Sequence, residues 1–253
     1  MREALQALLE NSSKRNVSEE ILSFDEYLQL VQQEPWVTRD TFQLLHDMLL
    51  SSGVDHAISP GKPIKHHYQF FENSERVGAY VVFGQQKAKE NLVEKINNAS
   101  RGLEASKRLW ILLGPPGAAK SRSMEGIKLA LKQYSQSEEG KTHTLLLPTV
   151  DKRLRDQALF EEEGIFYLQS PLFEKPLQVL PEETRKAFAS EIVNGTNQEI
   201  LKEWLANHPH YDKEFSVTIT GRLSPYSEYV LRDFMKMKDI SFTELLPYLK
   251  AKR

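Results

Sequence analysis

Eight consecutive residues, GPPGAAKS at 114–121, have the residue types and spacing of a phosphate-binding loop (P-loop). They match the pattern G-x-x-x-x-G-K-S/T at three of its four fixed positions, and Ala119 stands where the second glycine is usual. Lys120 would reach the β- and γ-phosphates of a nucleotide, and the Ser121 hydroxyl would coordinate Mg²⁺. Backbone N–H groups could approach the same anion past small side chains, here Gly114, Pro115, Pro116, Gly117, Ala118 and Ala119. The segment predicts an ATP·Mg²⁺ site with Lys120 as its catalytic cation.

The residues on either side of the loop favour this interpretation over an incidental Gly/Pro turn. Residues 109–113 (LWILL) form a short apolar run typical of a strand buried on both faces. A helix is expected from about 120 to 134, and its positive N-terminal end would face the phosphates. Ala119 adds one methyl group at the helix entry, a position that need not adopt a positive φ. We therefore expect a tighter loop that still binds.

Four nearby residues are candidates for further nucleotide contacts. Phe83 and Gly84, with Val82, precede the loop by one helix and could line an adenine pocket, although core packing explains them equally well. Arg122 follows the serine and could reach a phosphate, although a solvated arginine is the alternative.

Hydrolysis needs an acidic residue at the end of a neighbouring apolar strand. Asp151 follows LLLPTV, but Pro148 interrupts that run and the run comes soon after the loop, so the sequence gives little support for this role. Arg153 and Arg155 could act as a phosphate lid in a small-molecule kinase, or form the polar face of a short helix. His66 and His67 lie in a basic loop, and His208, His210 and Asp212 could chelate a metal; solvated surface residues are the simpler interpretation of both groups.

The elements around these residues alternate between helices and strands. A capping box, Ser23 to Glu26, begins the first helix, and Pro35 ends it. Apolar spacing predicts helices over 24–33, 38–52, 85–99, 182–193, 197–206, 226–237 and 242–249, besides 120–134. Short apolar runs predict strands over 78–83, 144–147, 164–168 and 215–220. This order favours an α/β fold with a parallel-type central strand, divided into a helical N-terminal extension (1–58), a linker (59–77) and a nucleotide-binding domain (78–253).

Composition excludes several classes of protein. The 253 residues contain 33 Lys+Arg and 35 Asp+Glu, and this balance gives no global field for nucleic acid or an anionic membrane. There is no cysteine, so disulfides and thiolate chemistry are excluded. No secretory or membrane-spanning segment is apparent, and we expect a cytoplasmic protein.

Beyond the loop, the chain resembles the PrkA family, whose members are known as serine protein kinases and begin with an AAA+-type ATPase domain. The similarity includes LSFDEYL at 22–28, the helix at 85–102, ASKRLWILLGP at 105–115, SPLFEKPL at 170–177 and LSPYSEY at 223–229. It implies an AAA+-like, three-layer P-loop NTPase domain, here incomplete at its C-terminus. It also implies ATP and Mg²⁺ as cofactors, and a homo-oligomer for the intact protein.

Two departures from the family are visible. Many members carry C-P-x-H and C-P-x-C in the last two segments, a spacing typical of a four-ligand metal site. Here Ser170, Phe173, Ser224 and Ser227 stand at those positions. No structural zinc is therefore expected, and packing of Phe173 and Tyr226 could replace it. Family members are also commonly more than twice as long, so this chain is expected to be their N-terminal portion and catalytically incomplete alone.

The resemblance implies ATP-dependent phosphorylation of protein serines by the intact protein, on an unknown substrate. Three alternatives stay open: an AAA+ ATPase that drives protein remodelling or proteolysis, a small-molecule kinase, and a nucleotide-sensing module without turnover. The lack of an evident acidic strand favours the last of these for the isolated chain.

Overall fold

A computed structural model describes residues 20–57, 65–194, 198–207 and 221–253. Contacts divide the chain into two compact units. The sheet unit contains the N-terminal residues up to Gln32 together with 143–185 and 220–253. The loop unit contains 33–142 and 186–219, including the predicted phosphate loop.

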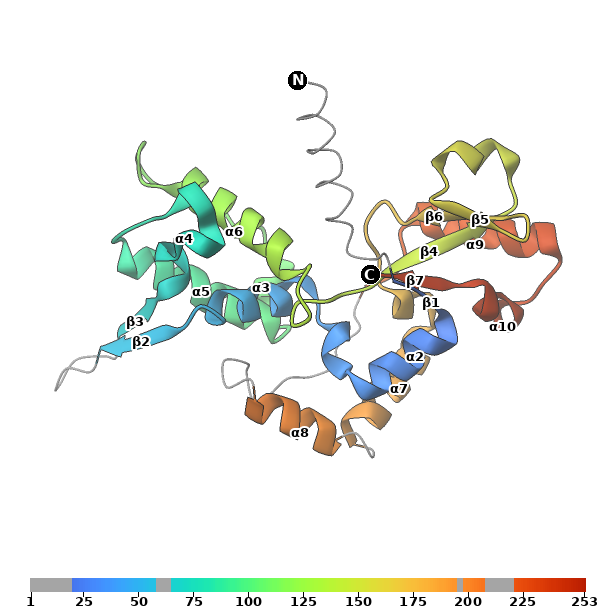
Figure 1. Cartoon of the computed structure of the whole chain (residues 1–253), viewed down its shortest axis with the longest axis horizontal. Helices are drawn as coiled ribbons and strands as arrows, with labels where there is room; N and C mark the ends of the chain where they lie inside the picture. The colour runs from blue at the N-terminus through green and yellow to red at the C-terminus, as the bar shows by residue number, and fades with distance from the viewer. Residues whose placement is uncertain (1–19, 58–64, 195–197, 208–220) are drawn as a thin grey trace, which may run out of the picture. The chain divides into compact units, whose positions relative to one another are not determined.

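The sheet unit is built on five strands in the order β1-β7-β4-β6-β5 (Figure 1). Every neighbouring pair is antiparallel, so the expected parallel-type sheet is wrong for the residues that the structure describes. The strands are β1 (Ile21–Ser23), β4 (Thr144–Thr149), β5 (Phe160–Glu162), β6 (Ile165–Gln169) and β7 (Lys250–Lys252). The predicted strand at 215–220 lies outside the described residues.

A tight turn produces one of the antiparallel pairs, and the pairing of β4 explains how this strand accommodates a proline. Glu163 and Gly164 both have positive φ, +50° and +76°, and join β5 to β6 in a two-residue hairpin turn. Pro148 is tolerated within β4 because β7 pairs only with Thr144–Leu146, so at Pro148 the strand pairs with β6 alone. Proline therefore does not interrupt this strand as the sequence suggested.

Helices cover the sheet and start where the sequence indicates. Ser23 and Glu26 form the predicted capping box of α2 (Phe24–Gln33), with the Ser23 Oγ 2.7 Å from Glu26 Oε2. Helix α9 (Pro225–Lys238) packs against β4, as Figure 1 shows. The other helical segments of this unit are η5 (Lys152–Gln157), η6 (Pro176–Val179), α10 (Phe242–Leu245) and η7 (Leu246–Tyr248), while α7 (Glu182–Asn194) continues from this unit into the other.

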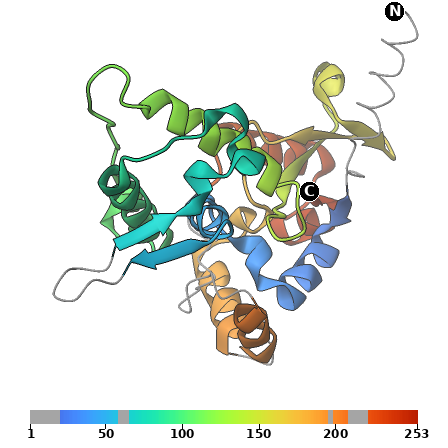
Figure 2. The same cartoon turned by 60° about the vertical axis from the view of Figure 1, so that its left-hand side comes forward.

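The loop unit is mainly helical. Helices α3 (Thr41–Leu50), α5 (Gln86–Ser100) and α6 (Lys120–Tyr134) contribute buried side chains to one core, with the short α4 (Ser74–Val77) against α6. Strands β2 (Val54–Ala57) and β3 (Lys65–Tyr68) form a hairpin beside α5 (Figure 2). The remaining elements are η1 (Pro35–Thr38), η2 (Gln69–Glu72), η3 (Gly78–Tyr80), η4 (Glu104–Lys107) and α8 (Gln198–Asn207).

Two predicted strands and one predicted loop are wrong. Residues 78–83 form η3 and an extended segment, and residues 109–113 belong to no sheet. Leu109 is 88% exposed and Leu113 87%, while Trp110 packs against the core on the other side. Conversely, part of the expected loop at 59–67 is strand β3. In the described residues of this unit, β2 and β3 pair only with each other, so the apolar run at 109–113 has no strand to bury it.

Across the described ranges, no helix combines the length and the apolar character that crossing a bilayer requires.

Candidate nucleotide-binding site

The phosphate loop leads directly into α6, as the sequence predicted. Helix α6 begins at Lys120, and residues 111–117 are exposed. Gly117 has φ +77°, and a Cβ added there would meet no atom within 4 Å, so the loop surface is open at this position. An exposed loop that ends at a helix N-terminus is a suitable place for an anion.

Ala119 adopts a left-handed backbone, with φ +52° and ψ +16°. The expectation that this position need not have positive φ is therefore wrong. A left-handed alanine costs about 1–2 kcal/mol because its Cβ crowds the following carbonyl. Glycine, usual at this position of the pattern, would avoid that cost.

Lys120 folds back over the loop. Its Nζ donates to the carbonyl oxygens of Gly114 and Pro115, each at 2.8 Å. The amine thus lies on the loop itself, and these two neutral carbonyls are weaker partners than a phosphate would be. Ser121 is exposed immediately after it.

A cavity of about 280 Å³ adjoins the loop. Its volume is just below the usual range for small-molecule sites. Within the loop unit, residues before α5, residues of α5 itself and the loop all contribute to its wall. The lining residues are Phe71, Val82, Gln85, Ala88, Lys89, Leu92, Leu112, Leu113, Gly114, Pro115, Ala118, Lys120 and Ser123.

Of the three residues predicted to contact adenine, one lines this cavity and two do not. Val82 lines it, whereas Phe83 is 74% exposed and neither Phe83 nor Gly84 is among the lining residues. Gly84 has φ +68° and Gln85 φ +53°, so the chain turns sharply before α5. This turn returns Gln85 to the wall beside Val82.

Lys89 is a site residue that sequence reasoning missed. It is only 4% exposed, and its Nζ donates to Glu72 Oε1 at 3.0 Å and to the Val82 carbonyl at 2.7 Å. Ala88, the residue before it, is exposed, so the buried face of α5 includes Lys89 and not Ala88. The spacing 89, 93, 96 was the available signal, since Val93 and Ile96 are buried on the same face.

Arg122 points to the segment before α5. Its Nε donates to the Val81 carbonyl at 2.9 Å, and its Nη2 donates to the Ala79 carbonyl. The guanidinium therefore connects the first turn of α6 to the backbone that leads to Val82.

The candidates for hydrolysis and for a phosphate lid all have polar partners in the sheet unit. The Asp151 carboxylate accepts from the backbone N–H of Arg153 and from its guanidinium, at 2.7–3.0 Å. Hydrogen bonding to the Arg153 side chain lowers the pKa of Asp151. Arg155 pairs with Glu161 at 3.3 Å. These contacts give each group a structural partner.

Ser170, Glu174, Ser224 and Ser227, which we call the serine–carboxylate cluster, meet in the sheet unit. The Glu174 carboxylate accepts from Ser170 Oγ at 2.5 Å, from Ser227 Oγ and from the backbone N–H of Ser224. Ser227 is fully buried, and Ser170 and Glu174 nearly so. The cluster thus joins the end of β6 to the start of α9 with a carboxylate at its centre.

Hydrogen bonds set the charge state of this carboxyl. Burial alone raises the pKa of Glu174, but donors from Ser170, Ser227 and Ser224 together outweigh it, so the pKa is lowered from its ordinary value. Packing of Phe173 and Tyr226, the expected replacement for a metal, is wrong. Phe173 is 68% exposed and Tyr226 39%.

In the part of the chain that the structure describes, no three His, Asp or Glu side chains are placed to hold a metal ion. His66 contacts His56, with 3.0 Å between their Nδ1 atoms, and His67 lies 3.6 Å from Glu72. His208, His210 and Asp212 lie outside the described residues.

Comparison with known proteins gives one family and one curated relative. A family model described as the PrkA AAA domain matches residues 22–201. A Bacillus subtilis (strain 168) protein named "ATP-dependent protease PrkA" is 24% identical over 170 residues, which are 67% of this chain and 22% of the relative. This chain therefore spans about a fifth of that relative's length. No solved structure matches.

Proposed function

Because this chain belongs to the PrkA AAA domain family, we propose that it binds ATP·Mg²⁺ through residues 114–121 as the nucleotide-binding portion of a PrkA-like protein. The observation that carries the proposal is the position of Lys120, whose amine lies on the loop beside a cavity of about 280 Å³.

The proposed roles follow from the contacts. The Lys120 amine exchanges its two carbonyl partners for phosphate oxygens, and the Ser121 hydroxyl becomes a ligand of Mg²⁺. The loop backbone from Gly114 to Ala119 receives the phosphates at the N-terminus of α6. Val82 and Gln85 contact the base, with Phe83 and Gly84 shaping the turn between them. Arg122 holds the backbone of Ala79 and Val81, which leads to Val82, rather than binding a phosphate.

Calorimetric titration of the 253-residue chain with ATP, with and without Mg²⁺, tests this proposal. Lys120→Ala should weaken ATP binding by about 30-fold or more, since removing a cation from a charge pair costs about 2–5 kcal/mol. Lys128→Ala is the matched control, because Lys128 lies on the same helix, is not among the residues that line the cavity, and has its Nζ 2.8 Å from Glu125 Oε1. Equal ATP affinity in the Lys120 variant and the control would overturn the assignment.

Two reactions are proposed for the protein that contains this portion. Phosphoryl transfer to protein serine follows from the family resemblance, with Lys120 and Mg²⁺ neutralising charge on the transferred group. ATP-driven proteolysis is the second candidate, and the printed name of the B. subtilis relative favours it. Arg153 and Arg155, the lid candidates for a small-molecule kinase, pair with Asp151 and Glu161, so their contacts do not favour that third reaction.

One experiment separates these reactions. The full-length protein that contains these 253 residues is incubated with γ-labelled ATP and casein. Its Lys120→Ala variant is treated in the same way. A kinase transfers label to casein, whereas a protease cuts casein in the presence of ATP without labelling it. Label without fragments would exclude proteolysis, and fragments without label would exclude the kinase.

A further inference from the structure

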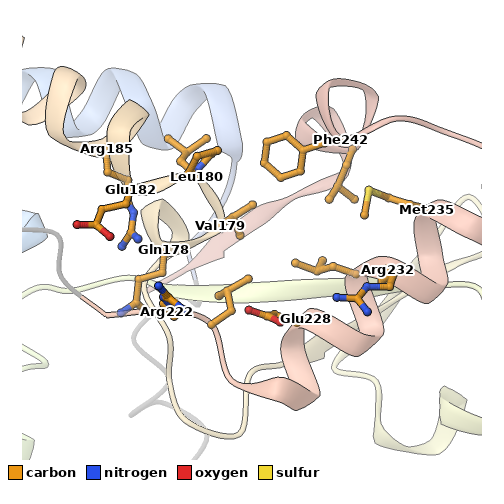
Figure 3. Close-up of a pocket in the computed structure, with 14 residues that line it drawn as sticks. Gln178, Val179, Leu180, Glu182, Arg185, Arg222, Glu228, Arg232, Met235 and Phe242 are labelled. Atoms are coloured by element: carbon orange, nitrogen blue, oxygen red, sulfur yellow. The ribbon is translucent and has the colours of Figure 1, made fainter.

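A second cavity, of about 390 Å³, lies within the sheet unit and is independent of the phosphate loop (Figure 3). Its wall comes from η6, the first turn of α7, helix α9 and α10. The apolar part of the wall is formed by Val179, Leu180, Pro181, Leu223, Leu231, Met235, Phe242 and Leu245. The volume is within the range of small-molecule sites.

The polar groups gather mainly at one end of this cavity. In Figure 3, Gln178, Glu182, Arg185 and Arg222 lie together, whereas Phe242 and Met235 lie at the opposite end, with Arg232 near Met235. Arg185 is only 4% exposed, and its Nη1 donates to the Gly221 carbonyl at 2.8 Å. A buried, fixed guanidinium therefore sits where the cavity is most polar.

Arg222 is the group available to a ligand. Its side chain is exposed, and among the described residues no carboxylate lies within ion-pairing distance of its guanidinium. Arginine forms two parallel hydrogen bonds with a carboxylate, which fix orientation as well as affinity. An anion at this end would have Arg185 as the second cation.

The charges of the wall favour a singly charged anion. The wall carries both signs, with Arg185, Arg222 and Arg232 positive and Glu182 and Glu228 negative. A monocarboxylate needs one cation, which Arg222 supplies. A phosphate monoester carries nearly two negative charges at neutral pH and would also face the two glutamates.

From this arrangement we propose that the cavity binds a monocarboxylate with an apolar chain, its carboxylate on Arg222 and its chain toward Met235 and Phe242. Free carboxylic acids and the C-terminus of a peptide with an apolar last residue share this chemistry. The proposal goes beyond nucleotide binding and uses none of the phosphate-loop residues.

Titration of the 253-residue chain with octanoate, followed by calorimetry, tests this site. Octanoate should bind with a dissociation constant below about 1 mM, and octanol and octyl phosphate at least about tenfold more weakly. Each CH₂ removed from octanoate should weaken binding about three- to fourfold, since the chain is buried against apolar side chains. A short peptide ending in leucine tests whether a peptide C-terminus can occupy the cavity. It is titrated as the free acid and as the C-terminal amide, and only the free acid should bind.

Variants assign the binding to this cavity. Arg222→Gln should weaken octanoate at least about tenfold, and Arg222→Lys should restore part of the loss. Arg108→Gln, an exposed arginine of the loop unit, is the matched control and should leave octanoate binding unchanged. The thermal midpoint of each variant verifies that it folds. Equal binding of octanol and octanoate, no effect of Arg222→Gln, or no octanoate binding up to about 10 mM would each overturn the proposal.

Discussion

The phosphate loop and the serine–carboxylate cluster are both made of small residues, but they treat their polar groups in opposite ways. The loop is exposed from 111 to 117, and Ala119 is held in a left-handed backbone beside it. The cluster is buried, and its carboxylate receives three donors from its own chain. The difference teaches that the proposed anion site leaves its loop backbone exposed, whereas the structural cluster supplies its own anion.

Removing the Glu174 carboxylate should have the largest effect. Glu174→Ala leaves two buried hydroxyl donors and the part-buried N–H of Ser224 without their acceptor, and we expect a loss of about 3 kcal/mol or more in the free energy of unfolding. Urea unfolding of the 253-residue chain measures it. Glu203→Gln, an exposed glutamate on α8, should change stability by less than about 0.5 kcal/mol. A Glu174 variant as mild as this control would mean that the cluster does not join the two segments.

The same carboxyl should make stability depend on pH. Its folded pKa is lowered below the unfolded value, so its contribution is complete above the unfolded pKa of about 4.3 and is lost as pH falls through the folded pKa. Stability measured from pH 7 down to pH 3 should therefore fall more steeply in the native chain than in Glu174→Gln. Parallel curves for the two proteins would contradict this assignment.

Arg122→Ala should lower the free energy of unfolding by about 1 kcal/mol, since it removes two hydrogen bonds from an exposed guanidinium to backbone carbonyls. ATP affinity separates its two possible roles. If Arg122 only holds residues 79–81, ATP and adenosine should weaken by the same factor. A loss confined to ATP would identify a phosphate contact and extend the loop by one residue.

Ala119→Gly should have the smallest effect, a gain of about 0.5–1 kcal/mol in the free energy of unfolding. Relief of the left-handed alanine is partly offset by the greater freedom of glycine in the unfolded chain. The midpoint of thermal unfolding should rise by a few degrees. Ala118→Gly is the comparison, because Ala118 does not have a positive φ and glycine there should bring no gain.

Local chemistry accounts for what could be predicted. The capping box at Ser23, the end of α2 before Pro35 and the start of α6 at Lys120 depend on residues within about four positions of one another, and all three are confirmed. The resemblance in the residues around the loop likewise identified the family. These features depend on residues that are close together in the sequence, so they can be predicted from it.

Tertiary structure decided the rest, because it depends on partners far away in the chain. Pairing of Ile21 with Lys252 adds β1 to the edge of the antiparallel sheet, and no local sequence pattern predicts it. The apolar run at 109–113 could not be assigned from the sequence for the same reason, since burial of a strand requires a neighbouring strand as well as apolar side chains. Glu174 was hidden for a related reason: its three donors come from 170, 224 and 227, and only the fold brings them to one carboxylate.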